Sequence, residues 1–186
     1  LELNFRLAQS RIDFLFDESN FFQSFLVDEG WIDKDRFTAM FGIFAMAEAV
    51  NVLQEKEARK GQYGSDAEAN KLGVRISKAI ASVVESRPMR NVWRDRALMH
   101  SQAGLSIDTG LTPGVRIPYG TEPDPVSHIE ALAAHHRYYV SGISEILTVD
   151  ETIKSNPEAM LQLCKGAFSC GFREFTANVA SNDLVR

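Results

Sequence analysis

Residues 156–179 read N-P-E-A-M-L-Q-L-C-K-G-A-F-S-C-G-F-R-E-F-T-A-N-V, and this stretch indicates the fold class. Asn156 followed by Pro157 has the cap-then-proline form of a helix start. Apolar side chains then recur at helical spacing as far as Phe168, and Gly171 is positioned to end the helix. Residues 172–179 are a strand candidate. A helix that leads directly into a strand is typical of mixed α and β structure.

The same alternation extends over the rest of the chain. The residues S-D-A-E at 65–68 form a capping-box pattern, and the amphipathic helix that follows is predicted to end near Arg87, before Pro88. The other predicted elements are helices over 4–29 (with a break near 18–20), 45–60 and 126–138, a strand over 37–44, and a loop or short strand over 139–149.

Glycines and prolines punctuate residues 91–125, which predicts one or two short strands joined by shaped loops. Strands that precede or follow helices favour parallel pairing with helical crossovers. We therefore expect a helix-rich α/β fold with short strands, in which residues 1–186 form a single domain or part of one.

The composition excludes several classes of function. The 186 residues carry a net charge of −5, and the 20 lysines and arginines are scattered, so no basic stripe is available for nucleic acid. No apolar run approaches the ~20 residues that span a bilayer, and we expect no membrane partner. The two cysteines make neither a disulfide framework nor a zinc site, which favours a reduced, cytoplasmic setting.

Histidines and cysteines are the first candidates for chemistry. The histidines are His100, His128, His135 and His136. His128 and His135 are seven residues apart and could share a helix face, but no carboxylate completes a metal set, so hydrogen-bonded or surface histidines are expected instead. Cys164 and Cys170 lie within or just after one apolar helical face, which predicts buried structural thiols.

The segment 106–118, S-I-D-T-G-L-T-P-G-V-R-I-P, is the best candidate for building a binding site. It places Asp108, Thr112 and Arg116 on a backbone shaped by glycine and proline, where a ligand can approach closely. Arg116 could hold a carboxylate or phosphate in bidentate fashion. Alternatively, Asp108 closes an Asx-turn and Arg116 makes a structural pair. The residues alone leave both interpretations open.

The two ends of the sequence lead us to expect a piece of a larger protein. The chain begins at Leu1 rather than at a methionine. Its last twelve residues, 175–186, form an extended run, a polar turn and an apolar restart that is cut off at Arg186.

Several stretches, in order along almost the whole chain, resemble the C-terminal part of the YjjI family of glycine radical enzymes. The resemblance rests on D-R-F-T-A-M-F-G (35–42), A-E-A-V-N (47–51), Y-G-x-D-x-E-A-N-x-L-G (63–73), T-P-G-x-R-I-P-x-G (112–120), S-G-x-x-E-I (141–146), N-P-E-A (156–159), K-G-A-F (165–168) and L-V-R (184–186).

The resemblance implies a share of a ten-stranded α/β barrel, built from two antiparallel half-barrels of parallel strands. It also implies a partner, a radical-SAM activase, which uses S-adenosylmethionine to take a hydrogen atom from a glycine in a C-terminal loop. The glycyl radical then oxidises a cysteine on a second loop, and the thiyl radical attacks a small-molecule substrate. Anaerobic metabolism is the corresponding setting, no bound cofactor is expected, and a homodimer is one expectation for the full-length parent.

The resemblance assigns no catalytic residue within the chain. Of the family's closing Arg-Val-Thr-Gly-Tyr motif only Arg186 is present, so Arg186 is expected to flank the radical loop and the radical glycine to lie beyond it. The thiyl cysteine is expected upstream of Leu1, because neither Cys164 nor Cys170 falls on the family's cysteine motif.

Three functions therefore compete. The chain is a C-terminal fragment of a glycyl radical enzyme that is inactive alone, a non-catalytic binding or regulatory module on the same fold, or a small conventional enzyme that uses His100 or the pair His135 and His136. A glycine-containing motif in the reading frame after Arg186 would separate the first function from the others. The resemblance does not imply the substrate.

Overall fold

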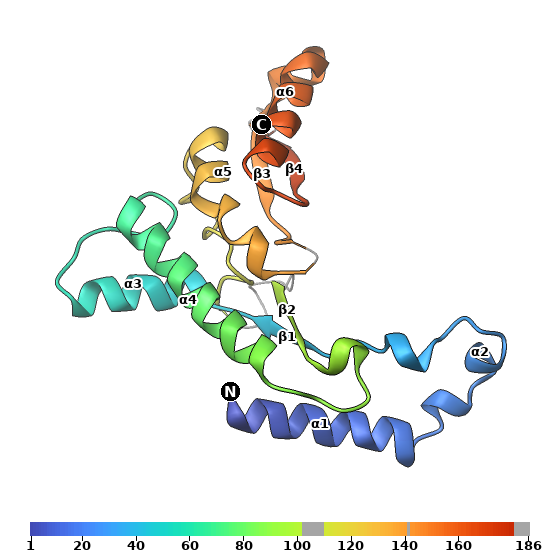
Figure 1. The fold of residues 1–186 in the computed structure, drawn as a ribbon. Coiled ribbons are helices and arrows are strands. Elements are labelled where there is room, and N and C mark those ends of the chain that lie inside the picture. The colour runs from blue at the N-terminus through green and yellow to red at the C-terminus, as the bar shows by residue number, and fades with distance from the viewer. Residues whose placement is uncertain (102–109, 141, 181–186) are drawn as a thin grey trace. The chain divides into compact units, whose positions relative to one another are not determined.

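The computed structural model describes residues 1–101, 110–140 and 142–180. The chain divides into two compact units, with Leu1–Phe41 and Ile80–Leu98 in unit 1 and Gly42–Ala79 and Met99–Arg186 in unit 2. Both contain mixed helix and irregular structure, and the strands are short (Figure 1). The prediction of a helix-rich mixed α and β fold is confirmed, whereas the single domain stays a prediction.

Unit 1 begins with helix α1, Glu2–Asp17, which ends where the sequence predicted a break. The 3-10 helix η1, Phe21–Gln23, and the short helix α2, Phe25–Asp28, follow. Phe16, Phe22 and Phe37 pack together, with ring centroids 4.1 Å apart for the first two and 5.7 Å apart for the last two. Phe22 is buried, whereas Phe21 and Phe25 are 43% and 67% exposed, so the phenylalanine-rich segment forms core only in part. The unit also contains the 3-10 helices η2, Lys34–Arg36, and η3, Trp93–Asp95.

Two strands and one helix cross the boundary between the units in sequence. Strands β1, Met40–Ile43, and β2, Leu98–Ser101, form a two-stranded sheet. Helix α4, Ala67–Ser86, covers almost the whole predicted range. Its cap differs from the prediction, because the Asp66 carboxylate accepts the Ala69 N–H at 2.8 Å while the Ser65 hydroxyl bonds back to Gln62. The capping signal was present but displaced by one residue.

Unit 2 is built around a helical crossover. Strand β3, Ile146–Asp150, leads through the 3-10 helix η6, Glu151–Ser155, and helix α6, Pro157–Ser169, into strand β4, Thr176–Ala180. The two strands pair in parallel, with Leu147 opposite Ala177 and Val149 opposite Val179. This arrangement confirms the predicted parallel pairing through a helix. The unit further contains α3, Met46–Lys56, α5, Pro125–Ala133, and the 3-10 helix η5, His136–Tyr138.

The ends of these helices follow from their sequence. Asp124 caps α5 by accepting the N–H groups of Val126 and Ser127, and Asn156 caps α6 by accepting the Ala159 N–H, the second as predicted. Gly171 follows the end of α6 with a positive φ of 105°. Helix α5 is shorter than predicted, because the chain turns after Ala133 and re-forms as η5.

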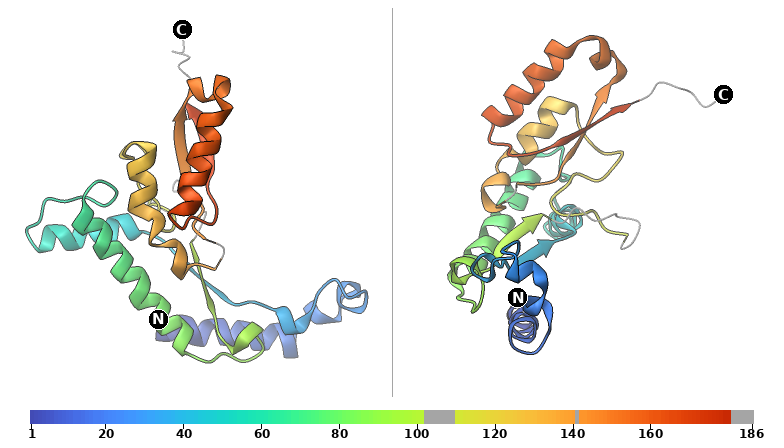
Figure 2. Two further views of the ribbon diagram at one scale, coloured as in Figure 1. Left: turned by 45° about the horizontal axis from the view of Figure 1, so that its top comes forward. Right: turned by 90° about the vertical axis from the view of Figure 1, so that its right-hand side faces the viewer.

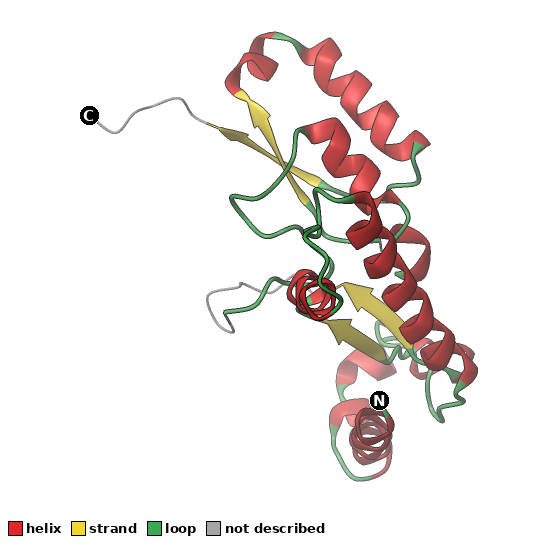
Figure 3. Cartoon of the chain, turned by 90° about the vertical axis from the view of Figure 1, so that its left-hand side faces the viewer, coloured by secondary structure: helices red, strands yellow, loops and turns green. Residues whose placement is uncertain are grey.

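The two faces of the β3–β4 pair differ in chemistry. Leu147 and Val149 are buried, whereas the alternate residues Thr148 and Asp150 are exposed. Helices α5 and α6 lie on one side of the pair, and the loop 110–124 lies on the other (Figures 2 and 3). The polar face of the sheet therefore meets the glycine- and proline-rich segment that the sequence singled out.

The described residues do not form a closed barrel. Their strands make two separate two-stranded sheets, β1–β2 and β3–β4. None of the helices in this part of the chain is long and apolar enough to cross a membrane.

Two helical glycines allow a matched test of the packing in unit 2. A Cβ at Gly73 would lie 2.6 Å from the buried Tyr63 ring, whereas a Cβ at Gly166 meets nothing within 4 Å. We predict that Gly73→Ala lowers the free energy of unfolding by about 1–3 kcal/mol through overpacking. Gly166→Ala should raise it by up to about 1 kcal/mol, because alanine has the higher helix propensity.

Urea unfolding followed by circular dichroism measures both changes. Equal effects of the two substitutions would contradict the close approach of α4 to Tyr63.

Candidate functional site

A pocket of about 180 Å³ lies beside the polar face of the β3–β4 pair. Side chains of this face, of the residues just before β3 and of the loop 112–122 line it. The lining residues are Thr112, Pro113, Arg116, Ile117, Tyr119, Glu122, Glu145, Ile146, Thr148 and Asn178. Two of the three predicted binding residues, Thr112 and Arg116, are thus brought to one pocket. The third, Asp108, lies outside the described residues, as does Arg186.

Arg116 is half-buried and anchored on the segment that leads into β3. Its Nε donates to the Ser144 carbonyl at 2.5 Å, and its Nη2 lies 3.4 Å from the Ser144 hydroxyl. Its Nη1 has no hydrogen-bond partner among the described residues. The two interpretations of Arg116 therefore combine, because one edge of the guanidinium is structural while the side chain still lines the pocket.

Thr112 is held by the start of helix α3. Its N–H and its hydroxyl both donate to Glu48 Oε1, at 2.8 and 2.5 Å. In return, the Thr112 carbonyl accepts the N–H of Ala45, the residue that precedes α3. This exchange pairs backbone groups that the helix start would otherwise leave unsatisfied. Because the hydroxyl proton of Thr112 is already donated, Thr112 can offer the pocket only an acceptor oxygen.

The backbone on both sides of Arg116 is fixed by the turn at 63–64. The Tyr63 hydroxyl donates to the Val115 carbonyl at 2.7 Å. A Cβ at Gly64 would lie 2.7 Å from the Ile117 side chain, so only glycine lets the turn approach this closely. Arg116 is therefore presented to the pocket from a rigid stretch of chain.

Tyr63 belongs to a buried chain of hydrogen bonds that runs in one direction. His135 Nε2 lies 3.2 Å from the Tyr63 hydroxyl, and its Nδ1 lies 2.9 Å from the Ser77 hydroxyl. Ser77 Oγ in turn lies 3.0 Å from the Tyr139 hydroxyl. The Tyr63 hydroxyl already donates its proton to the Val115 carbonyl, so His135 must donate to Tyr63 from Nε2. His135 then accepts at Nδ1 from the Ser77 hydroxyl, and Ser77 accepts from the Tyr139 hydroxyl. A neutral His135 satisfies every link.

The burial of this chain shifts its acid–base behaviour. Burial, and to a smaller extent the neighbouring His136, lower the pKa of His135 to about 3. Burial also raises the pKa of Tyr139 to about 12. It raises the pKa of Tyr63 well above its usual value, and the negative charge of Glu145 adds to that effect. All three groups are therefore neutral near pH 7.

A second buried pair lies directly at the pocket. His128 Nε2 and Glu145 Oε1 are 3.6 Å apart, and the two side chains are only 2% and 3% exposed. Glu145 Oε1 also accepts the N–H of Ile146 at 2.8 Å. Its other oxygen, Oε2, has no hydrogen-bond partner among the described residues. The sequence did not single out Glu145 as a site residue, although it belongs to one of the stretches that carry the family resemblance.

The expectation that His128 and His135 could share a helix face is wrong. Helix α5 ends at Ala133, so the two residues do not share a helix, and each has a different buried partner. His128, His135 and His136 are all buried, so the expectation of surface histidines is wrong for these three. The expectation of hydrogen-bonded histidines holds for His135 and His136. Within the described ranges, no group of three or more histidine, cysteine, aspartate or glutamate side chains could hold a metal ion.

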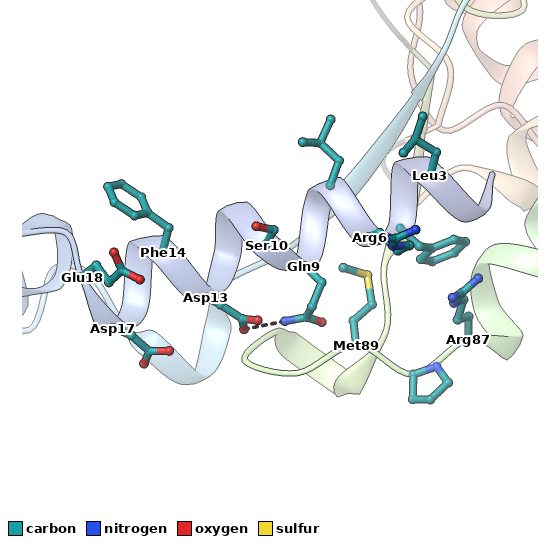
Figure 4. Close-up of a pocket in the computed structure, with 13 residues that line it drawn as sticks. Leu3, Arg6, Gln9, Ser10, Asp13, Phe14, Asp17, Glu18, Arg87 and Met89 are labelled. Carbon is teal, nitrogen blue, oxygen red and sulfur yellow. Dashed lines mark hydrogen bonds between the residues drawn. The ribbon is translucent and has the colours of Figure 1, made fainter.

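Unit 1 carries a larger but shallower hollow of about 830 Å³ between α1 and residues 87–89 (Figure 4). Two of its charged groups form ion pairs: Arg87 binds Glu2 through both terminal guanidinium nitrogens, and Asp13 binds Arg90 at 2.7 Å. In Figure 4, Gln9 and Asp13 face the segment with Met89 and are joined by a 2.8 Å hydrogen bond. These groups are exposed or half-buried, so the pocket in unit 2 is the better candidate for chemistry.

Comparison with known proteins identifies the family. The sequence matches the family described as Glycyl radical enzyme YjjI-like over residues 1–186. The chain belongs to this family. It is 55% identical over 181 residues to the uncharacterized protein YjjI of Escherichia coli (strain K12), an alignment that covers 97% of the chain. It is 32% identical over 184 residues, or 95% of the chain, to an uncharacterized protein of Haemophilus influenzae (strain ATCC 51907 / DSM 11121 / KW20 / Rd).

These relatives are much longer than the chain. It covers 35% of the length of each of them, so it corresponds to about a third of a YjjI-like glycyl radical enzyme. No solved structure matches the chain.

The cysteines of this YjjI-like chain are less buried than predicted. Cys164 is half-buried on α6, and Cys170, which caps the end of that helix, is exposed. The helical face on which the prediction rested is itself only partly covered, with Ala167 buried and Phe168 55% exposed. Apolar spacing identifies a face but not the extent to which other parts of the protein cover it.

The neutral His135 predicts an acid-sensitive fold. Its pKa is about 3 in the folded state and close to 6.5 when unfolded, so only the unfolded chain binds its proton between these values. The stability that it contributes is fully present above about pH 6.5 and is lost as the pH falls, by up to about 1.4 kcal/mol per pH unit.

Urea unfolding at pH 7.5 and pH 5.5 measures this loss. His135→Gln should be less stable at pH 7.5 but should lose less stability on acidification, because glutamine does not titrate. The same pH dependence in both proteins would show that His135 is not the group responsible.

Proposed function

We propose that residues 1–186 form the substrate-contacting C-terminal part of a YjjI-like glycyl radical enzyme, as a share of a ten-stranded α/β barrel. In this proposal the pocket beside β3–β4 binds the small-molecule substrate. Arg116 donates to an acceptor group of the substrate, Thr112 contributes an acceptor oxygen, and Asp108 remains a predicted third contact.

The observation that carries the proposal is the convergence of Thr112 and Arg116 on one pocket at the polar face of a parallel strand pair. Both residues belong to a stretch that resembles the family. A radical enzyme needs a substrate site that is fixed in place and shielded from water. The hydrogen bonds to Ser144, Glu48 and Tyr63 meet the first of these requirements.

The radical residues are proposed to lie in the rest of the parent protein. The curated relatives are about three times as long as the chain, which leaves room for them. The glycine would follow Arg186 and the thiyl cysteine would precede Leu1, and the glycyl radical, installed by a radical-SAM activase, would supply hydrogen-atom abstraction. An anaerobic, cytoplasmic setting accompanies this proposal, and a homodimeric parent remains part of it.

The test of substrate binding uses the full-length parent and propionate as a small acceptor-bearing probe. Arg116→Gln should weaken propionate binding at least tenfold in ligand-observed NMR, because it removes the positive charge and the donating guanidinium edge. Arg137→Gln removes the same charge from an exposed arginine of unit 2 that does not line the pocket, and it should bind propionate like the wild type.

Circular dichroism and the glycyl radical signal in electron paramagnetic resonance would establish that the Arg116→Gln protein is folded and can be activated. Unchanged propionate binding in such a protein would contradict the role of Arg116.

The cysteines of this chain are predicted to be dispensable for the radical reaction. In the full-length parent, Cys164→Ala and Cys170→Ala should keep turnover within a few-fold of wild type and should cost about 1 kcal/mol of stability or less, since neither thiol is fully buried. Turnover and the radical signal are measured together after activation. Complete loss of turnover in a folded, radical-bearing variant would place the thiyl site on that residue.

A further inference from the structure

The carboxylate of Glu145 is the unexplained group of the pocket. The side chain is 3% exposed, it lines the pocket, and Oε2 has no hydrogen-bond partner among the described residues. A buried carboxylate oxygen without a donor costs at least 1–3 kcal/mol, so proteins seldom retain one unless water, a ligand or chemistry uses it. Neighbouring groups do not relieve it: Ile146 bonds to the other oxygen, and His128 lies 3.6 Å from that same oxygen.

Arg116 does not neutralise Glu145, although the two residues line the same pocket. Arg116 is bonded to Ser144, the residue immediately before Glu145, yet no nitrogen of Arg116 comes within 4.0 Å of the Glu145 carboxylate. Two opposite charges are thus held near each other without forming an ion pair. A ligand that accepts at one end and donates at the other would bridge them.

The remaining lining residues favour a donor-bearing ligand. Glu122 is a second carboxylate of the pocket, so the acidic side chains outnumber the single arginine. Tyr119, Thr148 and Asn178 add neutral polar groups. The cavity volume of about 180 Å³ suits a small ligand.

We propose that Glu145 Oε2 is the acceptor for a hydroxyl or ammonium group of the substrate, and that it selects small bifunctional molecules whose other end carries an acceptor for Arg116. This inference rests on the proposed function, because it concerns the same pocket. His128 acts as a positioning residue, since its Nε2 lies 3.6 Å from Oε1 and has no hydrogen-bond partner among the described residues. Acyl or apolar substrates without a donor group would leave Oε2 unpaired.

The geometry allows a substitution that changes only the unpartnered atom, from an acceptor to a donor. In Glu145→Gln the amide oxygen must occupy the Oε1 position, because that position accepts the Ile146 N–H. The NH₂ group then replaces Oε2, so a donor stands where the unpartnered acceptor was. Glu122→Gln is the matched control, because it removes the same charge from the same pocket without touching Glu145.

The experiment measures dissociation constants in the full-length parent by ligand-observed NMR with three probes of one carbon skeleton. Propionate carries only the acceptor, 3-hydroxypropionate adds a hydroxyl, and β-alanine adds an ammonium. We expect wild type to bind 3-hydroxypropionate or β-alanine at least tenfold more tightly than propionate, and the favoured probe identifies which donor Glu145 receives. Glu145→Gln should abolish this preference while propionate binding stays within about threefold, and Glu122→Gln should retain most of it.

The outcomes separate the two proposals. A wild type that binds propionate through Arg116 but shows no preference for either donor-bearing probe overturns the role of Glu145 and leaves the proposed function standing. Persistence of the preference in Glu145→Gln has the same consequence. Propionate binding that is insensitive to Arg116→Gln overturns the proposed function itself. If Glu145→Gln does not fold, Glu145→Asp replaces it, because aspartate is one methylene shorter and withdraws the carboxylate. An undiminished preference for the donor-bearing probes in Glu145→Asp would likewise overturn the role of Glu145.

Discussion

Unit 2 depends on one buried chain of hydrogen bonds that links Tyr139, Ser77, His135, Tyr63 and Val115. Its members are brought together from segments separated by 52 to 72 residues in sequence. Each buried hydroxyl or imidazole would cost about 1–3 kcal/mol if left unpaired, so the chain is stable only when all links form together. Helix α4, η5, the turn at 63–64 and the loop at 115 are therefore fixed as a set.

This network supports the candidate site without entering it. It holds the Val115 carbonyl, and the adjoining Gly64 admits Ile117, so Arg116 is placed from both sides. The Glu48–Thr112 bonds secure the same loop from helix α3. A binding side chain that is held to within a fraction of an ångström needs this kind of supporting shell. The chain from Tyr139 to Val115 is buried and neutral, whereas charged side chains line the pocket beside it.

Six buried side-chain atoms have no hydrogen-bond partner among the described residues, and Glu145 is the one residue among them that lines the pocket. In the buried chain every donor finds an acceptor, yet Glu145 Oε2 at the pocket has no partner among the described residues. Local violations of good packing are expected to occur at functional positions. The parallel β3–β4 pair leads from this residue along the pocket, because helices α5 and α6 lie on one side of the pair (Figure 3) and Thr148 and Asn178 line the pocket on the other.

The sequence by itself determined what depends on neighbours along the chain. The caps at Asp124 and Asn156, the glycine after α6, and the helix between two parallel strands all follow from spacings of a few residues, over which backbone conformation and capping act. The family resemblance likewise came from short ordered motifs, whereas Thr112 and Arg116 were singled out by the glycine- and proline-shaped segment 106–118. Only the tertiary structure decided the partners of the buried polar groups, namely Ser77 and Tyr63 for His135 and Glu145 for His128, and the exposure of Cys170. Those outcomes depend on which distant segments approach each other, and the free energy of a buried polar or charged group is set by that long-range approach rather than by its sequence neighbours.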